Sequence, residues 1–301
     1  KLIKFRVHFM NTYESSPNDG KFGFMNRIKR GFRITKLGIH VVKADPELMV
    51  YLLFSVIMSV LSFGAVLTFT GGIGFVIGND GGFEGGVAVG TFISYFIVSV
   101  ITVFWNAAII ASAYERMTTG RNPSFSYGIK QAMKCFPQIL IWGLISGTVG
   151  VIIGFFEAMA ESDNIVVAII GHIISFMISF AWWMTTFFVV PMIVLENSGV
   201  FESMKKGPKL FDETWGENIV ASAGTGIINF IVILTIIVVC LPLFVFGEIG
   251  AALAFILIVI GIAISSLFFT ACDAVNKASM YYYAKTGEEV PLAQKYGLDT
   301  Y

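Results

Sequence analysis

Apart from serines and threonines, five polar side chains of this sequence could lie at membrane depth: Asn106, His172, Asn229, Asp273 and Asn276. An ionisable group at such depth is a functional hypothesis by default. Asp273 lies near the inner end of the last stretch, and Lys277, four residues on, is placed to pair with it. His172 lies about seven residues from an outer end, and no second ionisable residue at similar depth completes a proton relay. We therefore expect structural hydrogen bonding rather than relay chemistry from both Asp273 and His172.

Motifs for catalysis or metal binding are missing from the sequence. It has no Walker-type glycine loop, no His-Glu-x-x-His, no Gly-x-Ser-x-Gly and no pair of intramembrane carboxylates. The three histidines (His8, His40, His172) and three cysteines (Cys135, Cys240, Cys272) show no ligand spacing. We expect no enzyme activity, no metal and no cofactor.

Composition and hydropathy indicate an all-α integral membrane protein. Hydrophobic residues make up 56% of the chain and charged residues 13%, where an average soluble domain has roughly 25% charged residues. Stretches of this length and apolarity are typical of helices that cross a bilayer. Six such stretches are predicted, at 48–70, 87–113, 137–158, 165–191, 217–246 and 249–283.

The charges give these spans an orientation. All 20 Lys and Arg residues fall on one side of the six-span pattern, ten of them before the first span. The three opposite loops carry only acidic charges. Since positively charged loops stay in the cytoplasm, we predict a multi-pass protein of the cell membrane with both termini cytoplasmic. No cleavable signal peptide is expected before the first span.

An amphipathic helix is predicted at 22–45, just before the first span. One stripe of this helix is apolar (Met25, Ile28, Phe32, Ile39, Val42), and another is basic. Such a helix is expected to lie in the inner headgroup layer, where basic side chains attract anionic lipids rather than nucleic acid. The candidate headgroup ligands are Lys29, Arg33, Lys36 and Lys43, assisted by Lys205, Lys206 and Lys209 of a short helix at 199–212.

Glycines in the third span predict close helix packing. Gly143, Gly147, Gly150 and Gly154 recur on one helical face, where small residues let another backbone approach. Packing within the monomer is the favoured interpretation, with a glycine-lined path or a subunit contact as alternatives. The outer connection at 71–86 is also glycine-rich, which predicts a loop that is flexible or tightly folded. Pro191 is expected to bend or end the fourth span.

The domain organisation follows from these elements. We predict a polar arm at 1–21, the amphipathic helix at 22–45, a six-helix transmembrane domain at 46–285 and a polar tail at 286–301. Within the domain, a basic helix followed by two spans recurs from about Arg27, Ser124 and Phe201. This order fits a threefold parallel repeat of hairpins, and simple alternation of hairpins fits it equally.

Three stretches carry a resemblance to a known family: residues 36–48 before the first span, residues 188–196 around Pro191, and residues 203–218 around Trp215-Gly216. Together they resemble a family of prokaryotic six-pass membrane proteins, common in archaea, that is known only as a domain of unknown function. More distantly, the layout is similar to the membrane domain of some glycerophosphodiester phosphodiesterases. The resemblance implies the fold but no activity and no site residue.

The sequence therefore predicts a non-enzymatic membrane protein that acts as a lipid-interacting scaffold or as an accessory subunit of a membrane complex. Membrane lipids are the expected partners, together with a homo-oligomer or a larger assembly. The alternative is a small-solute channel or transporter with the glycines of the third span beside its path. Transporters usually show interrupted helices or paired intramembrane charges, and neither is evident here.

Overall fold

The computed structural model describes residues 19–77, 82–288, 290–295 and 297, and all regular structure within these ranges is helical. The predicted all-α membrane fold is confirmed. The long helices are α3 (Glu47–Ile77), α4 (Gly82–Thr119), α6 (Phe136–Ala160), α7 (Ile165–Thr186), α9 (Val200–Cys240) and α10 (Gly247–Thr286). The other elements are α2 (Asp19–Ala44), which precedes the first membrane segment, and the short α5 (Phe125–Lys134), α8 (Val189–Glu196), 3₁₀ turn η1 (Leu241–Phe246) and α11 (Pro291–Lys295).

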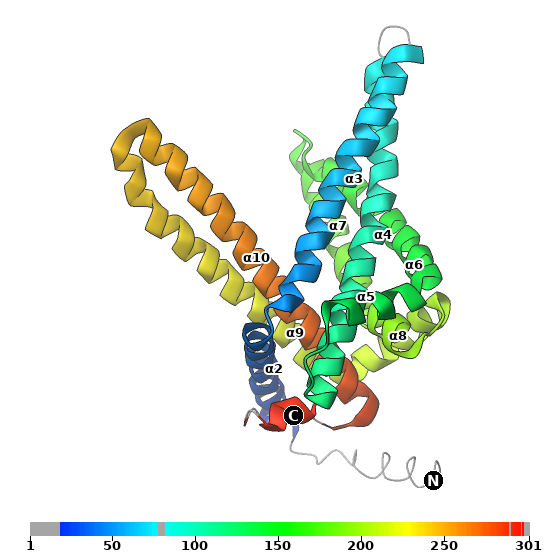
Figure 1. The fold of residues 1–301 in the computed structure, drawn as a ribbon, viewed down its shortest axis with the longest axis vertical. Helices are drawn as coiled ribbons and strands as arrows, with labels where there is room; N and C mark the ends of the chain where they lie inside the picture. The colour runs from blue at the N-terminus through cyan, green and yellow to red at the C-terminus, as the bar shows by residue number, and fades with distance from the viewer. Residues whose placement is uncertain (1–18, 78–81, 289, 296, 298–301) are drawn as a thin grey trace.

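Five segments of the described chain are long and apolar enough to cross a membrane. The first four correspond to α3, α4, α6 and α7 with α8, and the fifth runs from Ile219 to Thr286. This fifth segment comprises most of α9, the turn η1 and α10, and it folds back on itself as a hairpin (Figure 1).

The long helices form three hairpins that diverge from a common base (Figure 1). The α9–α10 hairpin leans away from α3 and α4, whereas α2 and α11 lie at the base. The buried core is concentrated at this base, where alanines of α4 (Ala107, Ala108, Ala111) meet alanines of α10 (Ala271, Ala274, Ala278). Their small side chains let the two backbones come close.

Two of the helical segments are bent, one of them next to a proline. Proline has no backbone N–H and clashes with the carbonyl four residues before it. In agreement with this, α7 ends at Thr186, and α8 begins at Val189 with Pro191 in its first turn. The fourth span is therefore bent, as predicted, although the break precedes Pro191. The predicted gap between helices 199–212 and 217–246 is instead a kink inside α9 at Thr214.

The glycine-rich outer connection is more helical than predicted. Helix α3 continues to Ile77 and α4 already begins at Gly82, leaving residues 78–81 outside the described residues. A Cβ on Gly74 would clash with the carbonyl of Gly82, and one on Gly86 would clash with the carbonyl of Thr70. Gly74, Gly82 and Gly86 therefore lie in helices and bring α3 and α4 into contact.

The two ends of the chain differ from the predicted domains in detail. Residues 1–18 of the predicted arm lie outside the described residues, and α2 already begins at Asp19. The predicted polar tail contains α11, which packs on α4 and buries Val290, Leu292 and Ala293.

Candidate lipid-binding surface

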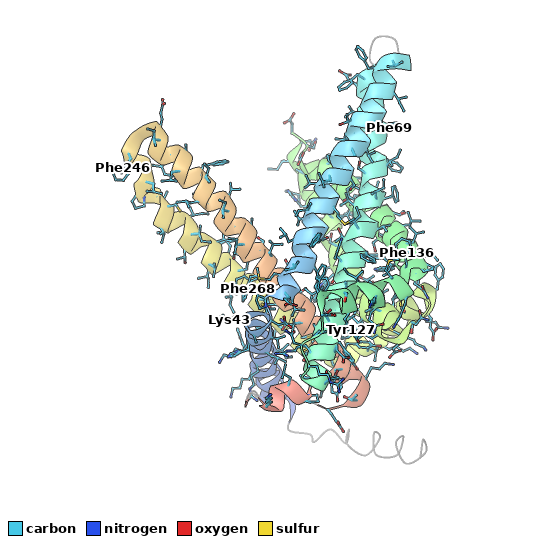
Figure 2. All side chains as sticks on the ribbon, in the orientation of Figure 1. Lys43, Phe69, Tyr127, Phe136, Phe246 and Phe268 are labelled. Atoms are coloured by element: carbon cyan, nitrogen blue, oxygen red, sulfur yellow. The ribbon has the colours of Figure 1, made fainter. Side chains whose placement is uncertain are left out.

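Helix α2 presents its cations on one exposed face. Lys29, Arg33, Lys36 and Lys43 are all exposed. Figure 2 shows Lys43 at the base of the α9–α10 hairpin and Phe246 at its opposite tip. We call these four residues the α2 cationic face. They lie at the end of the molecule that is remote from the apolar hairpin tips.

The opposite face of α2 is fixed against α9 and α10. Ile34, Leu37, Val41 and Val42 are almost wholly buried. Gly31 allows the contact with α9, since a Cβ there would lie 2.5 Å from the Cβ of Val220. Because α2 is held along one side, its cationic face has a defined direction.

This buried face only partly matches the predicted apolar stripe. Val42 is buried, but Ile39 is half-buried and the side chain of Phe32 is 49% exposed. The side chains of Met25 and Ile28 lie outside the described residues. The helix also buries Ile34, Leu37 and Val41, which the predicted stripe leaves out, together with glycine and threonine positions that periodicity of large apolar residues does not reveal. Phe32 is left on the same side as the cations.

Polar groups join α2 to the last hairpin. The Thr35 hydroxyl lies 3.2 Å from the carbonyl of Ala221 in α9 and donates to it. In the orientation that satisfies its hydrogen bonds, the Asn276 amide nitrogen donates to the carbonyl of Ile34 over 2.8 Å. The Asn276 amide oxygen accepts from the Thr225 hydroxyl over 3.1 Å. Buried polar groups satisfied in this way fix the register of three helices.

The second cationic group lies elsewhere. Lys205, Lys206 and Lys209 are exposed on the first part of α9, where Gly207 packs near Thr185 and Val189. Lys206 pairs with Glu202 over 2.5 Å, and this carboxylate raises the pKa of the Lys206 ammonium. The close contacts of α2 glycine and threonine positions with α9 lie beyond the Thr214 kink, at residues 220–224. The structure therefore does not merge the two groups into one site.

Most of the predicted glycine seam of the third span contacts α4. A Cβ on Gly143 would lie 2.7 Å from the Cα of Val100, and one on Gly147 would lie 3.1 Å from the Phe96 ring. Gly150 faces Tyr95 in the same way, whereas nothing lies within 4 Å at Gly154. Packing within the monomer accounts for three of the four glycines, and Gly154 does not belong to the seam.

The polar residues of the apolar stretches have different surroundings. Asp273 pairs with Lys277 over 2.8 Å, as their spacing predicts. His172 is exposed, and Asn106 is half-buried. Asn229 accepts a 2.6 Å hydrogen bond from the Ser265 hydroxyl. No group of three His, Cys, Asp or Glu side chains able to hold a metal occurs among the described residues.

A carboxylate at the end of α8 was missed by the sequence reasoning. Glu196 accepts hydrogen bonds from the Tyr281 hydroxyl at 2.5 Å and the Lys285 ammonium at 2.7 Å, both on α10. The available signal was the spacing of Tyr281 and Lys285, which places them on one helical face. Tyr281 and Lys285 on one helical face indicate a shared partner, but nothing in the sequence near them identifies that partner as Glu196.

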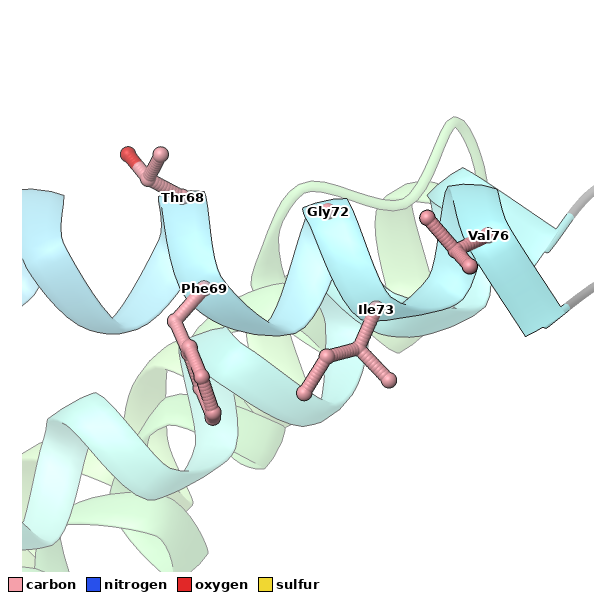
Figure 3. A pocket seen from close by; sticks show the side chains of 5 residues that line it. All are labelled: Thr68, Phe69, Gly72, Ile73 and Val76. Carbon is pink, nitrogen blue, oxygen red and sulfur yellow. The ribbon is translucent and has the colours of Figure 1, made fainter.

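The outer ends of α3 and α4 carry shallow apolar grooves. One, of about 430 Å³, is lined by Thr68, Phe69, Gly72, Ile73 and Val76 (Figure 3). The Thr68 hydroxyl donates to the carbonyl of Gly64 over 2.8 Å. These surfaces therefore offer mainly dispersion contacts, which suit acyl chains or apolar helices.

A known protein family matches most of this chain. The model of a family described as "Family of unknown function (DUF6159)" matches residues 86–290, more than half of the chain. The matched range contains the stretches around Pro191 and Trp215-Gly216, whereas residues 36–48 precede it. No curated protein matches the sequence.

Proposed function

The chain belongs to DUF6159, a family of unknown function, and from this premise we propose that it is a non-enzymatic, lipid-interacting membrane protein. In this proposal the α2 cationic face binds anionic headgroups while the hairpins lie among acyl chains. The protein then acts as a scaffold that organises lipid, or as an accessory subunit of a membrane complex. The distant similarity to phosphodiesterase membrane domains stays a prediction and contributes no residue.

The proposed topology has six crossings in the cell membrane and cytoplasmic termini. The apolar segment from Ile219 to Thr286 counts as two crossings, because η1 reverses the chain between α9 and α10. Lys205, Lys206 and Lys209 then lie on the same side as α2. This agrees with the rule that positive loops stay in the cytoplasm.

The observation that supports this proposal most strongly concerns the two faces of α2. One face is packed against α9 and α10, and the other exposes four cations. A helix already ordered by protein contacts loses little conformational entropy when lipids bind. Each base close to an anionic surface contributes about 1 kcal/mol. Four bases on one fixed helix therefore favour a local enrichment of anionic lipid.

The hairpins favour a scaffold over a channel. In the most apolar part of α6, 22% of the residues are buried inside the protein. In the most apolar part of the segment from Ile219 to Thr286, only 6% of the residues are buried. A channel needs helices that enclose a path, whereas these hairpins leave most of their apolar surface for lipid or partner helices. The glycine seam, filled by α4, also favours packing over conduction.

Reversal of the α2 charges tests the proposal. We expect K29E/R33E/K36E/K43E to lower the enrichment of phosphatidylglycerol over phosphatidylcholine several-fold in protein purified from mixed vesicles. The matched control R121E/K130E/K134E/K295E makes the same change in net charge at exposed positions on other parts of the chain. Thermal unfolding verifies that both variants are folded. Equal enrichment in wild type and the α2 variant, or an equal loss in the control, would contradict headgroup binding by α2.

A further inference from the structure

Asn229 places a half-satisfied amide in the apolar part of the last hairpin. Its partner among the described residues is Ser265, whose hydroxyl uses only one of the two ends of the amide. Exchanging the amide oxygen and nitrogen leaves the same deficit, since Ser265 still meets only one end. The residue is half-buried, so the free end reaches the surface of the hairpin.

The depth of Asn229 makes this deficit costly. Ser222, seven residues earlier in α9, lies 3.5 Å from the charged Asp273 and is level with it. At 1.5 Å per residue, Asn229 lies roughly 10 Å further into the apolar part. Its neighbours Ile227 and Phe230 are exposed, Phe230 by 65%. An amide in hydrocarbon without a partner costs several kcal/mol, and neither water nor headgroups supply a partner there.

A second copy of the chain supplies the missing hydrogen bonds. Two copies inserted in the same orientation are related by an axis along the membrane normal, which puts both Asn229 side chains at one depth. An amide is self-complementary, because it carries both donors and an acceptor. Gly226, one turn earlier, is exposed and has no atom within 4 Å of an added Cβ, so it leaves room for a neighbouring helix.

We propose that α9 is a homodimer contact in which Asn229 of each copy hydrogen-bonds the other across a two-fold axis. The exposed Gly226 and Phe230, which lie beside Asn229 on the helix surface, complete this contact. The inference rests on the proposed membrane position of the hairpin but not on headgroup binding. Polar pairs between membrane helices stabilise association modestly, so a reversible dimer is expected.

The test is energy transfer between copies labelled at an introduced E288C, in vesicles of uncharged phosphatidylcholine at increasing dilution in lipid. The three native cysteines are buried. We expect N229L to lower the association constant about three- to thirtyfold. N229Q, which keeps an amide, should restore it.

Two control variants separate this contact from the stability of the hairpin. S265A removes the intramolecular bond but keeps Asn229, so association should persist. T235V removes a hydroxyl that already donates to the carbonyl of Ile231 over 2.8 Å, so association should not change. A wild type that stays monomeric, or an N229L variant that associates equally well, would overturn the proposal. Anionic lipid is absent, so failure here leaves headgroup binding by α2 untouched.

Discussion

Asp45 is the residue at which α2 turns into the first membrane segment, and it is 2% exposed. Burial raises the pKa of its carboxyl group above the ordinary value of 3.8. The attraction of the Arg116 guanidinium acts in the opposite direction and is the smaller effect. The folded protein therefore favours the protonated form of Asp45.

This gives a pH dependence with a definite sign. A carboxyl group with a raised folded pKa stabilises the fold below its ordinary pKa, and that stability is lost as the pH rises through the raised value. We expect the melting temperature of D45N to increase relative to wild type as the pH rises from 4 to 7. Thermal unfolding in detergent micelles measures it, with D212N, the same substitution at an exposed position, as the control. A difference that is constant with pH would contradict the raised pKa.

At this scale, local pairs were predictable and distant ones were not. The pairing of Asp273 with Lys277 follows from a spacing of four residues on one helix. The contacts of Asn276 with Ile34 and Thr225 join helices from opposite ends of the chain. No periodicity within α10 indicates which helix will face Asn276.

Helices α3 and α4 approach each other closely through their glycines. Gly74, Gly82, Gly86 and Gly90 each lack room for a Cβ because the neighbouring helix occupies the space. Such contacts gain dispersion energy where the hydrophobic effect cannot drive helices together. Gly85, adjacent to Gly86, faces open space instead.

The two neighbouring glycines provide a matched pair of substitutions. We expect G86A to destabilise the protein by about 1–3 kcal/mol, because the added methyl group meets the carbonyl of Thr70. G85A should be neutral or stabilising by up to about 1 kcal/mol, since alanine favours the helix. Denaturant titration in mixed micelles measures both. Equal effects of the two substitutions would refute the α3–α4 contact.

The helices themselves were largely predictable from the sequence, but their ends were less so. Spans of apolar residues predict α6 and α10 to within a few residues, because burial in lipid requires such composition. The glycine-rich stretch at 71–86 predicts a loop by local propensity, and the helix–helix contact overrides that propensity. The kink at Thr214 likewise depends on how α9 crosses its neighbours. For the candidate site, the cations of α2 are exposed, and their binding of headgroups stays a prediction. Of the buried residues Ile34, Leu37, Val41 and Val42, the predicted stripe contained only Val42.

For the whole molecule, the direction of the hairpins is the testable property. In a cysteine-free background, E84C and E248C should react with a membrane-impermeant maleimide added to intact cells. K209C should react only after permeabilisation. If E248C reacted from the cytoplasmic side together with K209C, two crossings in the segment from Ile219 to Thr286 would be ruled out. If E84C and K209C reacted from the same compartment, the entire topology would be overturned.

The packing of α2 against α9 and α10, rather than against the hairpin that follows it, has a consequence for biosynthesis. Helix α2 leaves the ribosome early, yet the surfaces that cover its buried face are made last. Until α9 and α10 are inserted, Ile34, Leu37 and Val41 lack their final partners. Such long-range contacts form slowly and leave apolar surface exposed to aggregation in the interval. Translation that stops before α9 therefore leaves a nascent chain with an uncovered α2, a target for chaperones and membrane proteases.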